Sequence, residues 1–220
     1  MLKAVIFDLD GTLGDTISLC VESFCRCVQE YTGQRPSEQE VLAQFGVSDR
    51  GVLGALLGMA PEDPNLPTPR MAAIYEELHE QYAPAPFPGV VQLLQELRAQ
   101  GLRMAIITGK EAFTAQPTLR RFGMQGLFEE VLDGTPTHNC KAESLAGLLQ
   151  RWALQPAEVV YVGDAPSDIE QCHRAGIRII NAAWAPGAEA DRAACLALHP
   201  EYRLSDLKEL KPLLRTLYIS

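Results

Sequence analysis

The stretch Ala4-Val5-Ile6-Phe7-Asp8-Leu9-Asp10-Gly11-Thr12-Leu13 decides how the rest of the chain is interpreted. Its apolar first half, rich in β-branched and aromatic residues, predicts a short buried strand. Asp8 and Asp10 come at the end of this strand, and because side chains alternate along a strand they project to the same side. Gly11 then allows the chain to turn sharply away. Two carboxylates this close repel each other, and a hard cation such as Mg²⁺ would relieve the repulsion. The motif alone is equally compatible with a solvated polar turn.

Length and charge limit the kinds of partner. The chain has 220 residues, enough for one large domain or a core with a smaller lid, and a net charge of −9. This acidic balance argues against binding to nucleic acid or to an anionic membrane, both of which attract basic surfaces. We therefore expect a small-molecule partner, no nucleic acid and no membrane, and either a monomer or a homodimer.

The N-terminal residues and the cysteines indicate the compartment. Lys3 is followed by only a short apolar run that Asp8 interrupts, which is not the pattern of a signal peptide. We therefore expect a cytoplasmic protein whose six cysteines are free thiols, most of them filling the core. The spacing of Cys20, Cys25 and Cys27 spreads them over more than one face of a helix, which argues against a metal cluster there.

The first third of the chain predicts an all-helical segment. Ser37, followed by Glu40 three residues later, is a capping-box start for one of its helices. The expected helices cover residues 16–30, 38–44, 52–57 and 70–81, with a loop at 46–51, a proline-rich loop at 59–69 and a stiff linker at 84–89.

Beyond the linker, strands and helices alternate. Strands are expected at 102–107, 128–132, 159–162, 177–180 and 202–204, and helices at 90–100, 114–122, 142–152, 167–174 and from 205 onward. Pro117 is expected in the first turn of its helix. This alternation predicts an α/β fold with a Rossmann-like parallel sheet and helices on both faces. The catalytic core would comprise residues 1–14 and 86–220, and a helical cap domain, residues 15–85, would be inserted after the first strand.

Three predicted strands end in groups suited to a phosphate and a metal ion. The first ends in Asp8 and Asp10, the second in Thr108-Gly109, and the third in the run Gly163-Asp164-Ala165-Pro166-Ser167-Asp168. In a parallel sheet these ends lie side by side, where ligands bind. A hydroxyl and an exposed glycine N–H suit phosphoryl oxygens, the carboxylates suit Mg²⁺, and Lys141 after a nearby loop offers a point charge.

Four motifs in this order resemble the haloacid dehalogenase superfamily of phosphotransferases. They are D-x-D-G-T at residues 8–12, the strand-end Thr108, Lys141, and G-D-x-x-x-D at residues 163–168. The similarity covers essentially the whole chain, because the helical segment lies where that superfamily inserts its first-position cap. Residues 10–16, 87–90, 163–169, 175–176 and Trp184 look most like the phosphoglycolate-phosphatase-like branch. Ala142 follows Lys141 where that superfamily frequently has proline, so this chain departs from the family's pattern in that loop.

The resemblance implies a role for each motif. Asp8 would be the nucleophile that forms an aspartyl-phosphate, and Asp10 would protonate the leaving group and then activate water. Mg²⁺ would be held by Asp8, by Asp10 through its backbone carbonyl, and by Asp164, with Asp168 as a ligand or a supporting residue. The phosphoryl oxygens would be held by three groups: Thr108, Gly109 and Lys141.

Several of these assignments have simpler alternatives. Asp168 is also interpretable as the cap of the following helix, and Lys141 as a surface lysine. Lys110 competes as a phosphate clamp, but we interpret it as a surface or supporting residue, and His138 as loop surface. Arg50, in the loop before the third helix, is a candidate for reading a carboxylate or a second phosphate of the substrate, or else a solvent-exposed arginine.

The acid at position 10 separates the branches of the superfamily. Oxygen leaving groups require it, so cleavage of carbon–halogen or carbon–phosphorus bonds is disfavoured. The β-phosphoglucomutase type carries a histidine where this chain has Cys20, which favours a phosphatase over a sugar-phosphate mutase. The function expected is therefore Mg²⁺-dependent hydrolysis of a small phosphorylated metabolite. The alternatives are a mutase, a phospho-acceptor signalling domain, and a non-catalytic protein that binds a phosphorylated ligand.

Overall fold

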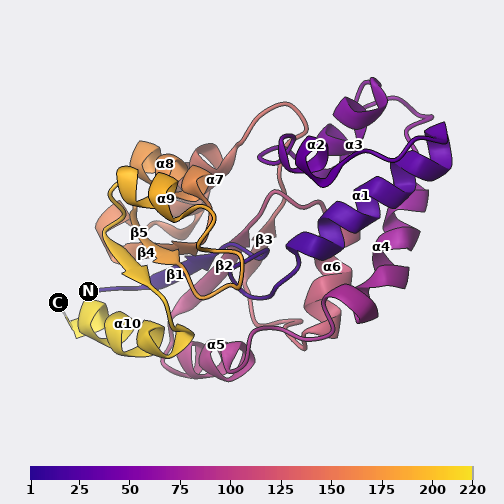
Figure 1. Cartoon of the computed structure of the whole chain (residues 1–220). Coiled ribbons are helices and arrows are strands. Elements are labelled where there is room, and N and C mark those ends of the chain that lie inside the picture. The colour runs from indigo at the N-terminus through magenta and orange to yellow at the C-terminus, as the bar shows by residue number, and fades with distance from the viewer. Residues whose placement is uncertain (220) are drawn as a thin grey trace.

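The centre of the molecule is a parallel β-sheet, seen in a computed structural model that describes residues 1–219 (Figure 1). Its six strands have the order β3-β2-β1-β4-β5-β6, and each neighbouring pair is parallel. The predicted α/β class is therefore confirmed. The strands are β1 (Ala4–Phe7), β2 (Arg103–Ile107), β3 (Glu130–Leu132), β4 (Val159–Gly163), β5 (Arg178–Ala182) and β6 (Tyr202–Leu204).

The central strand β1 is buried on both of its sides because helices cover both faces of the sheet. Ala4 and Ile6 belong to one apolar cluster, whereas Val5 and Phe7 belong to another, as the alternation of a strand dictates. The first cluster is covered by α7 (Lys141–Trp152), α8 (Pro166–Ala175) and α9 (Arg192–Ala197). The second is covered by α5 (Val90–Ala99) and α10 (Leu210–Ile219), on the opposite side of the sheet in Figure 1.

Most of the helices between β1 and β2 form a separate layer, drawn in indigo and purple in Figure 1. This layer consists of the first four of the five helices that separate β1 from β2, namely α1 (Ile17–Thr32), α2 (Glu38–Leu42), α3 (Asp49–Leu57) and α4 (Thr68–Tyr82); the fifth, α5, packs on the sheet. Helix α6 (Ala112–Arg121), which follows β2, packs against α4. The hydroxyl of Thr118 on α6 lies 2.8 Å from the Tyr75 hydroxyl and 3.0 Å from Nε2 of His79. These buried contacts join the helical layer to α6, the helix that follows β2.

Local sequence signals explain where the helices begin. The capping box is present: the Glu40 N–H donates to Ser37 Oγ at 3.2 Å, and the Ser37 N–H donates to Glu40 Oε2 at 2.8 Å.

Three expectations about the helices were wrong or incomplete. Helix α3 begins at Asp49, inside the expected loop, because Ser48 is extended and anchored through its N–H to Thr135 O at 2.8 Å. Helix α6 begins at Ala112, whose N–H donates to the Asp133 carboxylate, so Pro117 lies inside the helix. Helix α9 was not predicted, and its only buried residue is Cys195.

The C-terminal helix and the cysteines can also be compared with the predictions from the sequence. The C-terminal helix is preceded by a short 3₁₀ helix (Leu207–Glu209), and another (Pro156–Glu158) precedes β4. All six cysteines are buried free thiols, as expected. Within residues 1–219, none of the helices combines the length and the apolar composition that crossing a bilayer requires.

We expect Leu145→Ala to lower the free energy of unfolding by about 2–5 kcal/mol, because Leu145 on α7 is fully buried against the sheet. Chemical denaturation with a spectroscopic readout measures this loss. Gln150→Ala, at an exposed position of the same helix, is the matched control and should change stability by less than about 0.5 kcal/mol. Equal losses in the two variants would contradict the placement of α7.

Candidate active site

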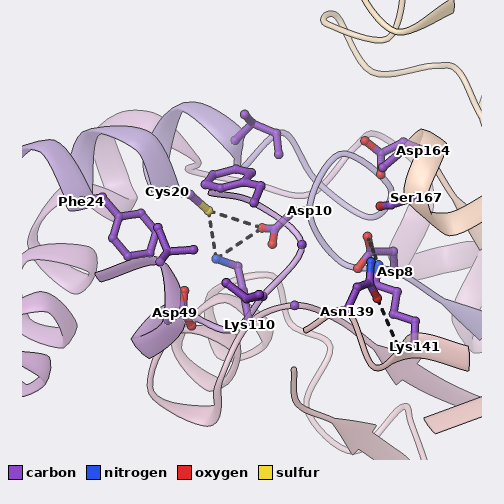
Figure 2. A pocket seen from close by; sticks show the side chains of 17 residues that line it. Asp8, Asp10, Cys20, Phe24, Asp49, Lys110, Asn139, Lys141, Asp164 and Ser167 are labelled. Carbon is purple, nitrogen blue, oxygen red and sulfur yellow. Dashed lines mark hydrogen bonds and ion pairs between the residues drawn. The ribbon is translucent and has the colours of Figure 1, made fainter. Parts of the chain in front are cut away.

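The parallel register brings the predicted site residues to one edge of the sheet. Phe7 pairs with Ile106 of β2 on one side and with Val162 of β4 on the other. The residues just beyond these strand ends therefore become neighbours. They line a pocket of about 140 Å³. Figure 2 shows Asp8, Asn139, Lys141, Asp164 and Ser167 at one end of this pocket, which we call the reaction end.

The turn after β1 depends on a glycine. Gly11 has φ +70°, a conformation that costs little only without a Cβ. A Cβ at this position would lie 2.1 Å from Oδ2 of Asp164, so a side chain would clash with the site itself. The Thr12 hydroxyl, one residue later, donates to Asp164 Oδ1 at 3.0 Å. Gly11 and Thr12 thus let the β1 turn and the end of β4 approach closely.

Asp8 is buried and paired with Lys141. Lys141 Nζ donates to Asp8 Oδ2 at 2.8 Å, and the Leu9 N–H donates to Asp8 Oδ1 at 2.8 Å. Burial raises the pKa of Asp8 to about 7 in spite of the neighbouring ammonium. Burial disfavours the charged form of Lys141 as well, but Asp168 and Asp8 outweigh it and raise the pKa of Lys141 above its usual range. Lys141 is therefore a buried cation of the site, and the surface interpretation is wrong.

Asp8, Asp164 and Asp168 offer oxygen atoms that all lie within 4.8 Å of one another. Burial, followed by the charges of Asp8 and Asp168, raises the pKa of Asp164 well above its usual value. Carboxylate oxygens at this density are the donor set that a hard divalent cation prefers, so these residues fit Mg²⁺. The Asp10 side chain does not belong to this group. This agrees with the expectation that Asp10 would bind the metal ion through its backbone carbonyl.

Asp168 also organises the protein around it. Its side chain is fully buried and accepts hydrogen bonds from Lys141 Nζ at 2.5 Å, the Tyr161 hydroxyl at 3.4 Å and the Ala165 N–H at 3.2 Å. The last of these caps the start of α8, as the alternative interpretation expected. Asp168 thus holds both Lys141 and the loop that carries Asp164.

The predicted phosphate-binding residues are placed differently from one another. Gly109 and Lys141 line the pocket, whereas Thr108 is buried beneath it. The Thr108 hydroxyl accepts the Lys110 N–H at 3.2 Å, which shapes the turn that presents Gly109. Asn139 and Ser167 also line the reaction end and were not predicted. Two features of the sequence could have indicated them: Asn139 lies two residues before Lys141, and Ser167 lies within the G-D-x-x-x-D motif.

Asp10 has a different environment from Asp8. Its Oδ1 accepts a hydrogen bond from the Thr16 hydroxyl and lies 3.4 Å from Lys110 Nζ. Lys110 is only 3% exposed, so of its two interpretations, surface or supporting residue, the surface one was wrong and the contact with Asp10 agrees with the supporting one. Its ammonium also lies 3.0 Å from Cys20 Sγ and 4.4 Å from the centre of the Tyr75 ring. Burial opposes its charge, but Asp10 and the other neighbouring groups raise the pKa of Lys110 well above the usual value.

Arg50 lies on the first turn of α3 and does not line the pocket. Its guanidinium contacts Glu111 Oε1 at 2.7 Å through Nε and at 2.6 Å through Nη2. Ser48 also donates to Glu111, at 3.1 Å. The guanidinium thus joins α3 to the start of α6, and a role for Arg50 in reading substrate stays a prediction. His138 is exposed, as expected.

Comparison with known proteins assigns the family. The model of the haloacid dehalogenase-like hydrolase family matches residues 5–182. The chain belongs to this family. The prediction of a hydrolase of this superfamily is therefore confirmed.

Curated relatives and solved structures match almost the whole chain. A phosphoglycolate phosphatase of Synechococcus elongatus is 28% identical over 214 residues, which cover 95% of each chain. The pyrophosphatase PpaX of Bacillus mycoides is 26% identical over 218 residues, which cover 97% of each. The crystal structure of a predicted phosphoglycolate phosphatase from Haemophilus somnus has a TM-score of 0.76 at 22% identity, covering 97% of this chain and 98% of that one. The last match supports the family fold.

A buried acid on α3 gives the site a pH dependence that stability measurements can detect. Burial raises the pKa of Asp49 from 3.8 to about 6. The folded state then binds this proton more tightly than the unfolded chain, so the wild type loses stability as pH rises through this interval. We expect Asp49→Asn to gain on the order of 1 kcal/mol relative to the wild type between about pH 4 and pH 7, by urea unfolding. Asp15→Asn, at an exposed position, is the control; a constant Asp49→Asn difference across pH would contradict the shift.

Proposed function

We propose that this hydrolase is a Mg²⁺-dependent phosphatase that cleaves a small phosphomonoester through an aspartyl-phosphate on Asp8. The observation that carries the proposal is the cluster of buried Asp8, half-buried Asp164 and buried Asp168, with Lys141 bonded to Asp8 and Asp168. The phosphatase names of the relatives agree with it. The substrate that we propose is a small phosphorylated metabolite. The cytoplasmic location and the monomeric or homodimeric state of the protein stay predictions.

The charges of the cluster explain why a divalent cation belongs there. When all three carboxylates are ionised, the single ammonium of Lys141 leaves two negative charges uncompensated in a buried site. Mg²⁺, held by Asp8, Asp164, the backbone carbonyl of Asp10 and, directly or through water, Asp168, would balance that excess. When bound, it would neutralise charge on the phosphoryl oxygens and on the attacking carboxylate.

The side chains themselves account for the chemical steps. An oxygen of Asp8 attacks the phosphorus, and the bond to the leaving oxygen breaks on the opposite side. Asp10 donates a proton to that oxygen and then takes a proton from the water that hydrolyses the aspartyl-phosphate. Lys141 and the N–H of Gly109 hold the phosphoryl oxygens as charge moves onto them, and Thr108 supports the turn.

The helical layer supplies the lid of this reaction. We propose residues 15–85 as the cap domain and residues 1–14 and 86–220 as the catalytic core. The pocket is lined from both parts, by Ile17, Phe24 and Val52 of the cap and by the strand ends of the core. Closing such a lid excludes water and completes the site.

The environment of Cys20 argues against the mutase alternative. In the β-phosphoglucomutase type, this position carries a histidine that can exchange protons near neutral pH. Burial raises the pKa of Cys20 to about 12, so its thiol holds its proton in that range. A non-catalytic binding protein is disfavoured because it has no need for the buried, mutually repelling acids.

We expect Asp8→Asn to lower the rate of phosphate release by at least about three orders of magnitude, because it removes the nucleophile. The assay uses a panel of phosphorylated metabolites, with Mg²⁺ and with chelator. Asp15→Asn makes the same chemical change at an exposed position and should retain activity.

Two results would contradict this proposal. One is undiminished turnover in folded Asp8→Asn. The other is no release by the folded wild type from any compound with Mg²⁺ present. Interconversion of sugar phosphates without phosphate release would favour the mutase instead.

A further inference from the structure

The pocket extends beyond Asp10 to an end that differs in chemistry from the reaction end. Figure 2 shows Cys20, Phe24, Asp49 and Lys110 on the far side of Asp10 from Asp8. Since Asp10 protonates the leaving oxygen in the proposed mechanism, the rest of the leaving group lies at this far end.

The far end is walled largely by apolar side chains of the helical layer. They come from α1, from the turn between α2 and α3, and from α3. We call them the apolar wall: Ile17, Cys20, Phe24, Phe45, Val47 and Val52. Phe45 is 37% exposed, and its ring lies edge-on to that of Phe24 with centroids 6.5 Å apart. A ligand that covers an exposed aromatic side chain at a pocket wall removes apolar surface from water, which stabilises the complex.

The charged groups at the far end do not favour an anionic leaving group. Of the lining residues, all within the described range 1–219, Lys110 is the one cation at this end. It is already engaged by Asp10, Cys20 and the Tyr75 ring. The Asp49 carboxyl also lies at this end, and its Oδ2 accepts hydrogen bonds from the Glu111 N–H at 2.7 Å and the Thr114 hydroxyl at 2.5 Å. Arg50, one residue later, is held by Glu111 outside the lining.

A second anionic group on the leaving group would therefore be buried beside Asp10 and Asp49 without a free cation, which is unfavourable. An uncharged apolar group would instead cover the apolar wall. We propose that the substrate is the phosphate monoester of an uncharged alcohol with a ring-sized or short aliphatic body, selected mainly by Phe45 and Val47. This inference rests on the proposed phosphatase function, and it departs from phosphoglycolate and pyrophosphate, whose leaving groups are anions.

The first test compares benzyl phosphate, glycerol 1-phosphate, phosphoglycolate and pyrophosphate as substrates of the wild type with Mg²⁺. We expect kcat/KM for benzyl phosphate to exceed that for phosphoglycolate by about tenfold or more. Preference for phosphoglycolate or pyrophosphate would overturn the inference and leave the phosphatase proposal standing. If none of the four is hydrolysed, the metabolite panel above decides the phosphatase proposal, and calorimetric titration of the protein with benzyl phosphate and phosphoglycolate decides the inference: tighter phosphoglycolate binding overturns it.

The second test changes the apolar wall. Phe45→Ala should lower the ratio of kcat/KM for benzyl phosphate to that for methyl phosphate by about tenfold, because methyl phosphate lacks the group that covers the ring. Leu42→Ala is the matched control, since Leu42 is 39% exposed on α2 and does not line the pocket; its ratio should not change. Equal ratios in Phe45→Ala and the wild type would overturn the role of Phe45.

A third variant adds the missing cation. Val47→Lys should raise kcat/KM for phosphoglycolate relative to benzyl phosphate by about tenfold, because it places an ammonium at the far end. Thermal unfolding of each variant confirms that it is folded before rates are compared. No change in preference in a folded Val47→Lys variant would contradict the placement of the leaving group.

Discussion

Repulsion among three close carboxylates, two of them buried and the third half-buried, is the constraint on which the active site depends. Asp8, Asp164 and Asp168 are held with oxygens within 4.8 Å of one another, in surroundings that raise the pKa values of Asp8 and Asp164. Such an arrangement costs stability unless cations compensate it. Lys141 supplies one positive charge, bonded to both Asp8 and Asp168. The remaining negative charge is what the divalent cation of the proposed mechanism would compensate.

The sheet makes this arrangement possible because its strands are parallel. Residues that are far apart in sequence, such as Asp8 and Asp164, meet because β1 and β4 are neighbours and end at the same edge. Gly11 and Thr12 allow the two loops to approach within hydrogen-bond distance. The helical layer closes the pocket from the other side, and its side chains differ in kind from those of the core. The core thus contributes most of the charged residues of the pocket and the helical layer most of its apolar ones, which in the proposed mechanism act on the phosphorus and cover the leaving group.

The groups at strand ends were predicted well from the sequence, because each strand is a local pattern and the carboxyl ends of parallel strands meet at one edge of the sheet. Asp8, Asp164, Gly109 and Lys141 therefore reach the pocket as expected. For Lys110 the sequence left a surface and a supporting role open, because its burial depends on Cys20 and Tyr75, which belong to helices far away in sequence. Asp49 was missed because α3 begins earlier than its apolar pattern indicates, and its partners Glu111 and Thr114 come from α6. Local patterns carry no information about such contacts between layers.

The most direct test of the account is to trap the phosphorylated protein. Wild type mixed with Mg²⁺ and a reactive acyl phosphate, quenched in acid within a turnover and digested, is examined by mass spectrometry. The account predicts one phosphoryl group on the peptide that contains Asp8, lost in Asp8→Asn and retained longer when Asp10, which activates the hydrolytic water, is replaced by asparagine. A phosphoryl group on any other residue, or rapid turnover by a folded Asp8→Asn variant, would contradict it.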